Sequence, residues 1–367
     1  MGSTLDRPLT EDQKTKILSI SSRAHVTSYS ASFVYNYGEF RGNPEQLMKD
    51  YFDAMLYMSN WGARRLMLRI PRSLINTQAS RLYCISEEID AIMTSNHVIF
   101  DFNFHDEDLS EWTEGEGWLD DLIGLREEVL QGDFRVFYLA WLKAIKNALV
   151  SGDIDEDTLE PPVPSGLGQL SPALKKFISF LELDEAMLAV SAQKSENLQQ
   201  KNPLQLEKWI EKLPIKEQHN FLSRLSRGEP NLSIFLNIRL NELDRKAQSR
   251  KEAMNTEQRT ISELIQSVKK WQKFKKEEEQ RKVELERKHK LEELGAKENQ
   301  MWQKVDSLIE EKKPKSYDMA IVLLRDLQSL AEYRGKLEEF KERIVKIQQS
   351  YSNRPGLRDR LHQATLI

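Results

Sequence analysis

The side chains best suited to chemistry lie on or just after one strongly alternating segment, residues 97–104 (HVIFDFNF). The alternation predicts a strand in which His97 and Asp101 share one face, opposite the phenylalanines, with Asp106 and Asp108 following. Carboxylates that hold Mg²⁺ and a histidine that acts as general base would suit a metal-dependent hydrolase or nuclease. A solvent-exposed sheet face gives the same pattern, and no Glu-x-Lys signature accompanies this strand. The hydrolase is therefore the third of three functions that we consider.

A second group of interest is a glycine-bracketed turn at residues 38–44 (GEFRGNP). Asn43 is suited to cap a helix and Pro44 to occupy its first position. Exposed N–H groups at that helix start, beside Arg41 and Gly42, could receive a phosphate or a carboxylate. The alternative is an ordinary capped turn between a strand and a helix, because no P-loop or Rossmann fingerprint is present.

Cationic side chains concentrate further along, where residues 245–290 hold 15 Lys/Arg and 8 Asp/Glu without Gly or Pro. Seven of them could contact a phosphate backbone: Lys269, Lys270, Lys273, Lys275, Lys276, Arg281 and Lys282. The glutamates at 277–279 interrupt this cluster, so a solvated spacer helix explains the composition as well.

An acidic loop at residues 105–117 (HDEDLSEWTEGEG) contains six carboxylates and Trp112. Such a loop can be simply hydrated, or it can bind a basic surface of a partner or of this chain. Trp112 is the residue that hydration does not explain, and it is therefore a candidate for partner binding.

Composition and charge limit the class of protein. The chain has 367 residues, of which 39% are hydrophobic, enough for at least one core. Its net charge of -4 conceals a net of -12 in residues 1–160 and +8 in the remainder. The single cysteine, Cys84, excludes a disulfide framework within the chain and fits a reducing cytosol. The longest apolar run, residues 136–142, is far shorter than the roughly 20 residues of a membrane span, so we expect a soluble, cytoplasmic protein.

The elements that must position these groups fall into four predicted parts. Residues 1–160 are predicted to form an acidic α+β domain with a small sheet. Its predicted strands are 30–37, 65–70 and 97–104, and its predicted helices are 43–62, 77–84, 87–93, 118–131 and 134–150. After a Pro/Gly-rich connection at 151–171, residues 161–246 are predicted to form a helical domain. Its predicted helices are 172–182, 184–193, 203–212, 215–227 and 231–246.

Residues 247–313 form the third part, a long charged helix or a weak coiled coil. Ile261, Leu264, Val268 and Trp271 follow coiled-coil spacing for about two repeats, after which charged residues occupy the seam. A helix from Glu257 to Lys312 would span roughly 80 Å. Pairing of this helix with a second copy would give a homodimer.

Residues 314–367 form the fourth part, a helical hairpin that turns at Arg334-Gly335. Its apolar stripes include Leu324 and Leu327 on the first helix and Phe340 and Ile344 on the second. These four residues are candidates for binding another protein.

Three stretches resemble an uncharacterised family of bacterial proteins: residues 35–48 (YNYGEFRGNPEQLM), 60–72 (NWGARRLMLRIPR) and 160–174 (EPPVPSGLGQLSPAL). This resemblance extends over nearly the whole chain and implies no established activity. Residues 301–344 resemble the helical C-terminus of some bacterial proteins that carry a SWIM-type zinc finger. The finger itself needs a cluster of Cys and His ligands that one cysteine and six histidines cannot supply. The resemblance implies a shared docking partner, such as a SWIM-type or helicase-type protein.

The sequence thus predicts a mainly α fold: an α+β N-terminal domain with a small sheet, a helical domain, a long charged helix and a C-terminal helical hairpin. No motif specifies a catalyst, a metal site or a nucleotide, and we expect no cofactor. The leading hypothesis is a non-enzymatic adaptor that uses its acidic head and its C-terminal hairpin as docking surfaces. The alternative is a nucleic-acid-associated subunit that contacts phosphates through the basic helix.

Overall fold

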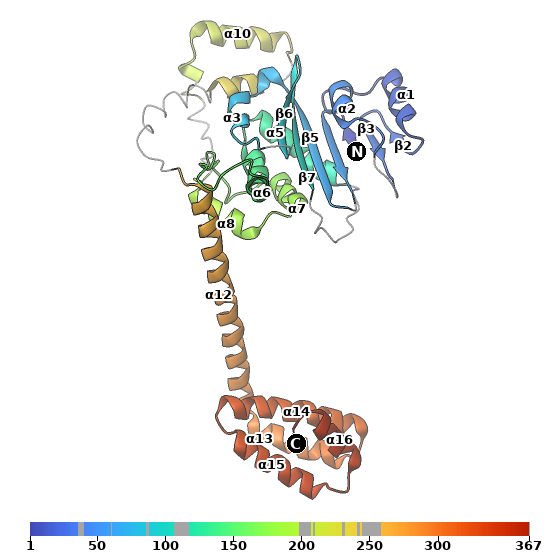
Figure 1. Cartoon of the computed structure of the whole chain (residues 1–367), viewed down its shortest axis with the longest axis vertical. Helices are drawn as coiled ribbons and strands as arrows, with labels where there is room; N and C mark the ends of the chain where they lie inside the picture. The colour runs from blue at the N-terminus through green and yellow to red at the C-terminus, as the bar shows by residue number, and fades with distance from the viewer. Residues whose placement is uncertain are drawn as a thin grey trace. The chain divides into compact units, whose positions relative to one another are not determined.

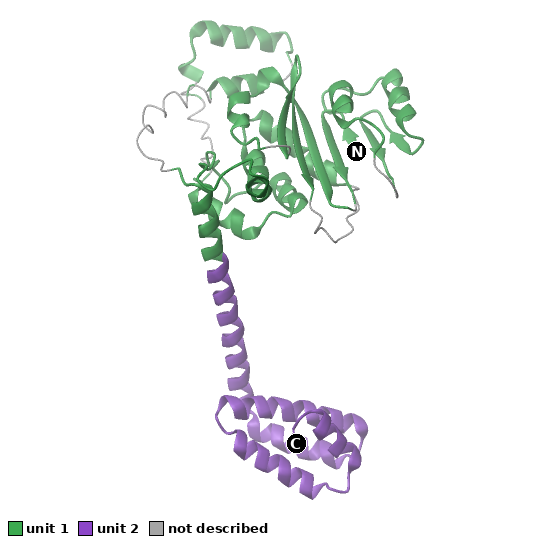
Figure 2. Ribbon diagram, in the orientation of Figure 1, with its two compact units in different colours: residues 1–271 green, residues 272–367 purple. Residues whose placement is uncertain are grey.

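In the computed structural model the chain is mainly helical and includes one seven-stranded antiparallel sheet (Figure 1). The structure describes residues 1–35, 40–59, 61–85, 88–105, 117–197, 207, 210–229, 232–240, 243 and 258–366. The chain divides into two compact units, Met1–Trp271 and Gln272–Ile367 (Figure 2). None of the helices in the described part is both long enough and apolar enough to cross a membrane.

The sheet belongs to the first unit. Its strands are β1 (Gly2–Ser3), β2 (Ala24–Val26), β3 (Ser30–Phe33), β4 (Ala54–Met58), β5 (Ala63–Pro71), β6 (Ile89–Met93) and β7 (His97–His105). Their order is β2-β3-β1-β4-β5-β7-β6, and every neighbouring pair is antiparallel. The two longest strands, β5 and β7, pair along their whole length, from Ala63 opposite His105 to Pro71 opposite His97.

Alternation in β5 and β7 creates the main core, because successive side chains of a strand point to opposite faces. Leu66, Leu68 and Ile70 of β5 lie on the same face as the apolar residues of β7, and all of them are buried. The residues from β7 are Val98, Phe100, Phe102 and Phe104. The strand predicted at 97–104 and its apolar face are therefore confirmed.

Helices cover this face of the sheet (Figure 1). They include α4 (Trp118–Leu122), α5 (Gly124–Leu130), α6 (Arg135–Ser151), α7 (Pro172–Leu181) and α8 (Glu185–Lys194). Phe137 of α6 packs edge-on against Phe100, with ring centroids 4.6 Å apart. Phe177 of α7 packs against Phe102, so residues on both sides of the predicted boundary at 160/161 share one core.

The other face of the sheet carries a smaller core beneath α1 (Glu11–Ile20) and α2 (Pro44–Asp50). Met67 of β5 and Ile99 of β7 contribute to it. The same face also presents the polar side chains of Arg65, Arg69 and Asp101, which the pairing of β5 with β7 brings close together. This polar part of the face is where the candidate site lies.

Two helices predicted within residues 1–160 are wrong in part or in whole. The helix predicted at 43–62 begins at Pro44 with Asn43 as its cap, but it ends at Asp50, and residues 54–58 form β4. Because β4 is a central strand, its side chains are buried on both faces, and its sequence is a continuous apolar run. Such a run cannot be distinguished from part of the apolar side of a helix by its periodicity alone. The helix predicted at 87–93 is also wrong, because residues 89–93 form the edge strand β6 and pair with β7.

Shorter elements complete the first unit: η1 (Arg72–Leu74), α3 (Thr77–Arg81) and α10 (Ile215–Ser226). The helix predicted at 215–227 is thus confirmed, and residues 232–240 of the one predicted at 231–246 are helical. Most of the helix predicted at 203–212 lies outside the described residues.

The long helix α12 spans Ile261–Ala296, about 54 Å at 1.5 Å per residue. It begins with a capping box in which Thr260 Oγ1 accepts the N–H of Glu263 and Glu263 Oε2 accepts the N–H of Thr260. The single helix predicted to reach Lys312 is wrong, because α12 ends at Ala296 and α13 (Glu298–Glu310) begins after Lys297.

In the second unit α13 packs with α14 (Pro314–Tyr333), α15 (Leu337–Ser350) and α16 (Pro355–Gln363). The predicted hairpin is confirmed as α14 and α15, which turn at Gly335 with a φ of 68°. Such a positive φ suits glycine, which has no Cβ to clash. The hairpin is one half of a four-helix bundle whose other members are α13 and α16.

Candidate functional site

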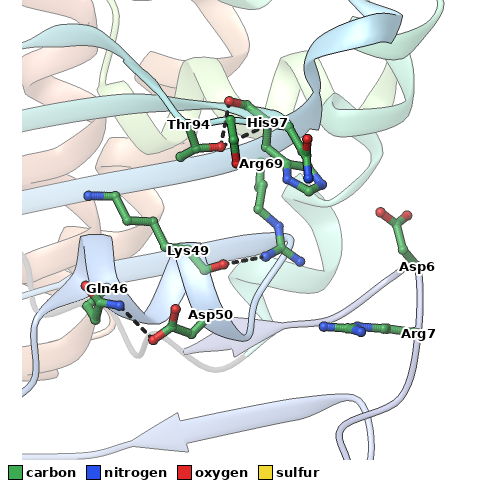
Figure 3. A pocket seen from close by; sticks show the side chains of 10 residues that line it. Asp6, Arg7, Gln46, Lys49, Asp50, Arg69, Thr94 and His97 are labelled. Atoms are coloured by element: carbon green, nitrogen blue, oxygen red, sulfur yellow. Dashed lines mark hydrogen bonds between the residues drawn. The ribbon is translucent and has the colours of Figure 1, made fainter.

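A cavity of about 630 Å³ opens beside α2 on the polar part of the sheet (Figure 3). Three segments and one strand residue line it. They are the N-terminal strap (residues 4–9, through Asp6 and Arg7), α2 (through Gln46, Lys49 and Asp50), the β6–β7 turn (residues 94–97) and Arg69 of β5. Every lining side chain is polar or charged, so this cavity differs from the mostly apolar pockets that bind drug-like ligands.

A buried ion-pair network adjoins the cavity and contributes Arg69 and Asp6 to its lining. Arg69 donates from Nη2 and Nε to Asp53 Oδ1 at 2.7 and 3.1 Å, and from Nη1 to the carbonyl oxygens of Met48 and Lys49. Arg126 of α5 donates to the carbonyl oxygen of Arg69 at 2.9 Å and to Asp6 Oδ2 at 2.8 Å.

The network holds five segments together. Asp53 Oδ2 accepts the N–H groups of Leu5 and Asp6 at 2.7 and 3.0 Å, which fixes the strap. Arg69 also binds the last carbonyl groups of α2, which have no partner within the helix. The strap, α2, the residue before β4, β5 and α5 therefore meet at two carboxylates and two guanidinium groups.

Protonation states follow from these contacts. Burial raises the pKa of Asp53, but the N–H groups of Asp6 and Leu5, together with Arg69, outweigh burial and bring the pKa below its ordinary value. Desolvation lowers the pKa of His97, and the positive charge of Arg69 lowers it further. His97 is therefore a neutral imidazole at the cavity wall at neutral pH.

The carboxylate predicted to hold a metal is bound by an arginine instead. Arg65 Nε and Nη2 donate to both oxygens of Asp101, at 2.5–3.1 Å. The Asp101 carboxylate raises the pKa of Arg65, as expected for an ion pair. Across the described residues, no three His, Cys, Asp or Glu side chains come together as metal ligands would. Asp106 and Asp108 lie outside that part of the chain.

The predicted anion site at Arg41, Gly42 and Asn43 is placed at the start of α2. Asn43 Oδ1 accepts the N–H of Gln46 at 3.0 Å, so the cap already uses one of the donors that an anion would need. Arg41 is exposed beside it. The cavity lies along the rest of this helix, at Gln46, Lys49 and Asp50.

The seven predicted phosphate-binding residues all lie on α12 and, apart from the half-exposed Lys275, are exposed. Glutamates of the same helix stand beside two of them, Lys273 with Glu277 at 4.0 Å and Lys282 with Glu278 at 3.4 Å. Exposed pairs of this kind contribute little to stability. Nucleic-acid binding by this helix stays a prediction.

The apolar residues of the predicted coiled-coil seam pack against other parts of the same chain. Ile261 and Leu264 are fully buried in the core of the first unit, together with Val268. They are therefore not available to pair with a second copy. Between Gln272 and Lys290 every residue of α12 except Lys275 is exposed.

A buried network at the start of α12 was not foreseen from the sequence. Arg259 donates to both carboxylate oxygens of Glu160, and Tyr138 Oη donates to Glu160 Oε1 at 2.5 Å. All three side chains are almost completely buried. The sequence signal that could have located this junction is the Thr260-x-x-Glu263 capping box.

The four predicted docking residues of the hairpin lie in the core of the bundle. Leu324, Leu327, Phe340 and Ile344 are at most 4% exposed. They hold the helices together and do not form a surface. Trp112, the other predicted partner-binding residue, lies outside the described residues.

The exposed apolar residues of α14 are different ones. Met319, Val322 and Tyr333 are 47%, 60% and 44% exposed. Spacings of three and eleven residues place them along one side of the helix. We call these three residues the α14 row.

Comparison of the chain with models of protein families, with characterised proteins and with solved structures found no match. The resemblance to an uncharacterised bacterial family and to SWIM-type proteins therefore stays an expectation.

Proposed function

We propose that this chain is a non-enzymatic interaction protein that binds another protein through the α14 row of its C-terminal bundle. The observation that carries the proposal is that three large apolar side chains remain exposed along one side of a helix whose opposite side is fully packed. Met319, Val322 and Tyr333 are the exposed residues, and Leu324 and Leu327 are among the packed ones. Met319 and Val322 lie one turn apart and form an exposed apolar pair, and Tyr333 lies eleven residues further along the same side. Exposed apolar surface favours contact with a partner.

The acidic part of the chain supports the same proposal. Residues 1–160 carry a net charge of -12, which would favour a basic surface on a second partner. One chain with an apolar row in one unit and an acidic surface in the other can bind two partners, which is the action of an adaptor.

The test is capture of partners from cells by the full-length chain. We expect Met319→Glu/Val322→Glu to weaken capture of its specific partner about tenfold or more, because the interface would have to desolvate two carboxylates. Val283→Glu is the matched control, since Val283 is 65% exposed on α12 and lies outside the bundle. Circular dichroism should show unchanged helix content in both variants. Capture of the same proteins by the wild type and both variants would refute the proposal.

A further inference from the structure

The cavity beside α2 belongs to the first unit and is separate from the α14 row of the second. Its volume of about 630 Å³ lies within the range of 300–1,000 Å³ that is typical of small-molecule sites. Among its lining residues Arg69 is buried, at 8% exposed, and its ion-pair partner Asp53 is 0% exposed. A polar lining favours a small charged ligand that is recognised by hydrogen bonds.

Most of the charged groups around the cavity are paired with a neighbour of opposite charge. Asp53 neutralises Arg69, and Arg126 neutralises Asp6 through the hydrogen bonds of the network. Among the lining groups this leaves Arg7, Lys49 and Asp50. Asp50 accepts a hydrogen bond from Gln46 Nε2 at 2.7 Å, and Lys49 Nζ stands 3.5 Å from Glu45.

Arg7 is the lining residue whose hydrogen-bond donors are most available to a ligand. Its side chain is exposed, and it makes no hydrogen bond or ion pair with any residue of the described chain. Figure 3 shows its guanidinium group pointing from the strap into the cavity. The planar fork of a guanidinium matches the two oxygens of a carboxylate or phosphate, and such charge-assisted pairs are strong.

We propose that the cavity binds a small molecule through a carboxylate or phosphate group, which Arg7 receives bidentately. Ser95 and Asn96 of the β6–β7 turn provide neutral polar groups for the rest of the ligand. Neutral His97 stands at the same wall and can donate or accept a hydrogen bond. This site is independent of the proposed docking by the α14 row.

Calorimetric titration of the full chain with two probes, inorganic phosphate and succinate, tests this site. We expect one of them to bind, and its affinity to fall about tenfold in Arg7→Gln, because a charged hydrogen-bond partner is lost. Arg23→Gln is the control: Arg23 is an exposed arginine of the same unit that does not line the cavity. The probe that binds shows whether phosphate or carboxylate is preferred.

A second measurement reports on the cavity itself. The charges of Arg69, Asp53, Asp6 and Arg126 all act on the pKa of His97. A bound anion would add negative charge, so its presence should raise the pKa of His97 in an NMR titration of the wild type but not of Arg7→Gln. Binding of neither probe would overturn the proposal. Equal weakening by Arg7→Gln and Arg23→Gln would also overturn it, because it would indicate attraction to surface charge only.

Discussion

Asp53 is the residue at which the strap, the sheet and α5 converge. Its side chain is 1% exposed and accepts hydrogen bonds from two backbone N–H groups and from Arg69. A buried carboxylate is tolerated only when its charge and its lone pairs are satisfied, and Asp53 meets both conditions.

Replacement of Asp53 by Asn should therefore be strongly destabilising. The variant keeps the size of the side chain but leaves the buried charge of Arg69 without its partner, at a cost of about 3 kcal/mol in the free energy of unfolding. Urea denaturation at pH 7 measures this loss. Asp12→Asn, which removes an exposed pair with Lys16, is the control and should have no measurable effect.

The effect of Asp53→Asn should also depend on pH. Since the folded state lowers the pKa of Asp53 below 3.8, the wild type gains stability from its charge above that value and loses it as the pH falls through the folded pKa. The stabilities of wild type and variant should therefore approach each other in acid. A difference that stays constant down to low pH would contradict this account.

Little of this residue-scale arrangement could be predicted from the sequence. Arg65 and Arg69 alternate with Leu66 and Leu68, so they could be assigned to one face of a strand. The partners of these arginines could not be assigned, because Asp53 and Asp101 reach them only through the register of neighbouring strands and the position of α2. The cavity was missed for the same reason, since its lining residues come from four separate segments.

At the scale of elements, the start of α12 is fixed by the pair of Glu160 and Arg259. Two further hydrogen bonds support it, from the N–H of Ile261 to the carbonyl oxygen of Thr158 and from the N–H of Ser262 to that of Glu156. Local pairing and a buried ion pair together attach the first turns of this helix to the main core.

Loss of Arg259 should loosen this attachment. In Arg259→Met the buried carboxylate of Glu160 has only Tyr138 as partner, and the amides of Ile261 and Ser262 should exchange with solvent faster. Hydrogen exchange followed by NMR measures this change. The double variant Glu160→Gln/Arg259→Met removes both charges and should restore part of the protection. Unchanged exchange in Arg259→Met would show that apolar packing alone holds the helix.

Elements with a strong local signal were predicted well. In three cases the residue types within the segment itself determine its structure. These are the alternation of β7, the Asn43-Pro44 start of α2 and the turn at Gly335. The elements predicted wrongly are those whose structure depends on packing and pairing with neighbouring elements. β4 is buried on both faces, and β6 is a strand because β7 pairs with it.

At the scale of the whole molecule, each unit has its own apolar core, and no residue belongs to both. The charge asymmetry of the sequence indicated that the chain is divided into parts. It could not show that residues 261–268 pack with the first unit, because the same apolar spacing suits a coiled coil.

Separate cores should unfold separately. Leu324 of the bundle and Leu174 of the main core are both fully buried, and replacement of either by Ala should cost about 2–5 kcal/mol. In differential scanning calorimetry of the full chain we expect two transitions, with Leu324→Ala lowering one midpoint and Leu174→Ala the other. A single transition that both variants shift equally would contradict the division.

The position of β1 constrains the order in which the sheet can be completed during synthesis. Gly2 and Ser3 are synthesised before their partners on either side, which are residues 30–31 and 54–55. Both edges of β1 can therefore be hydrogen-bonded only after residues 54–55 of β4 have been synthesised. Until then, β3 and β4 have no strand between them to join the two parts of the sheet.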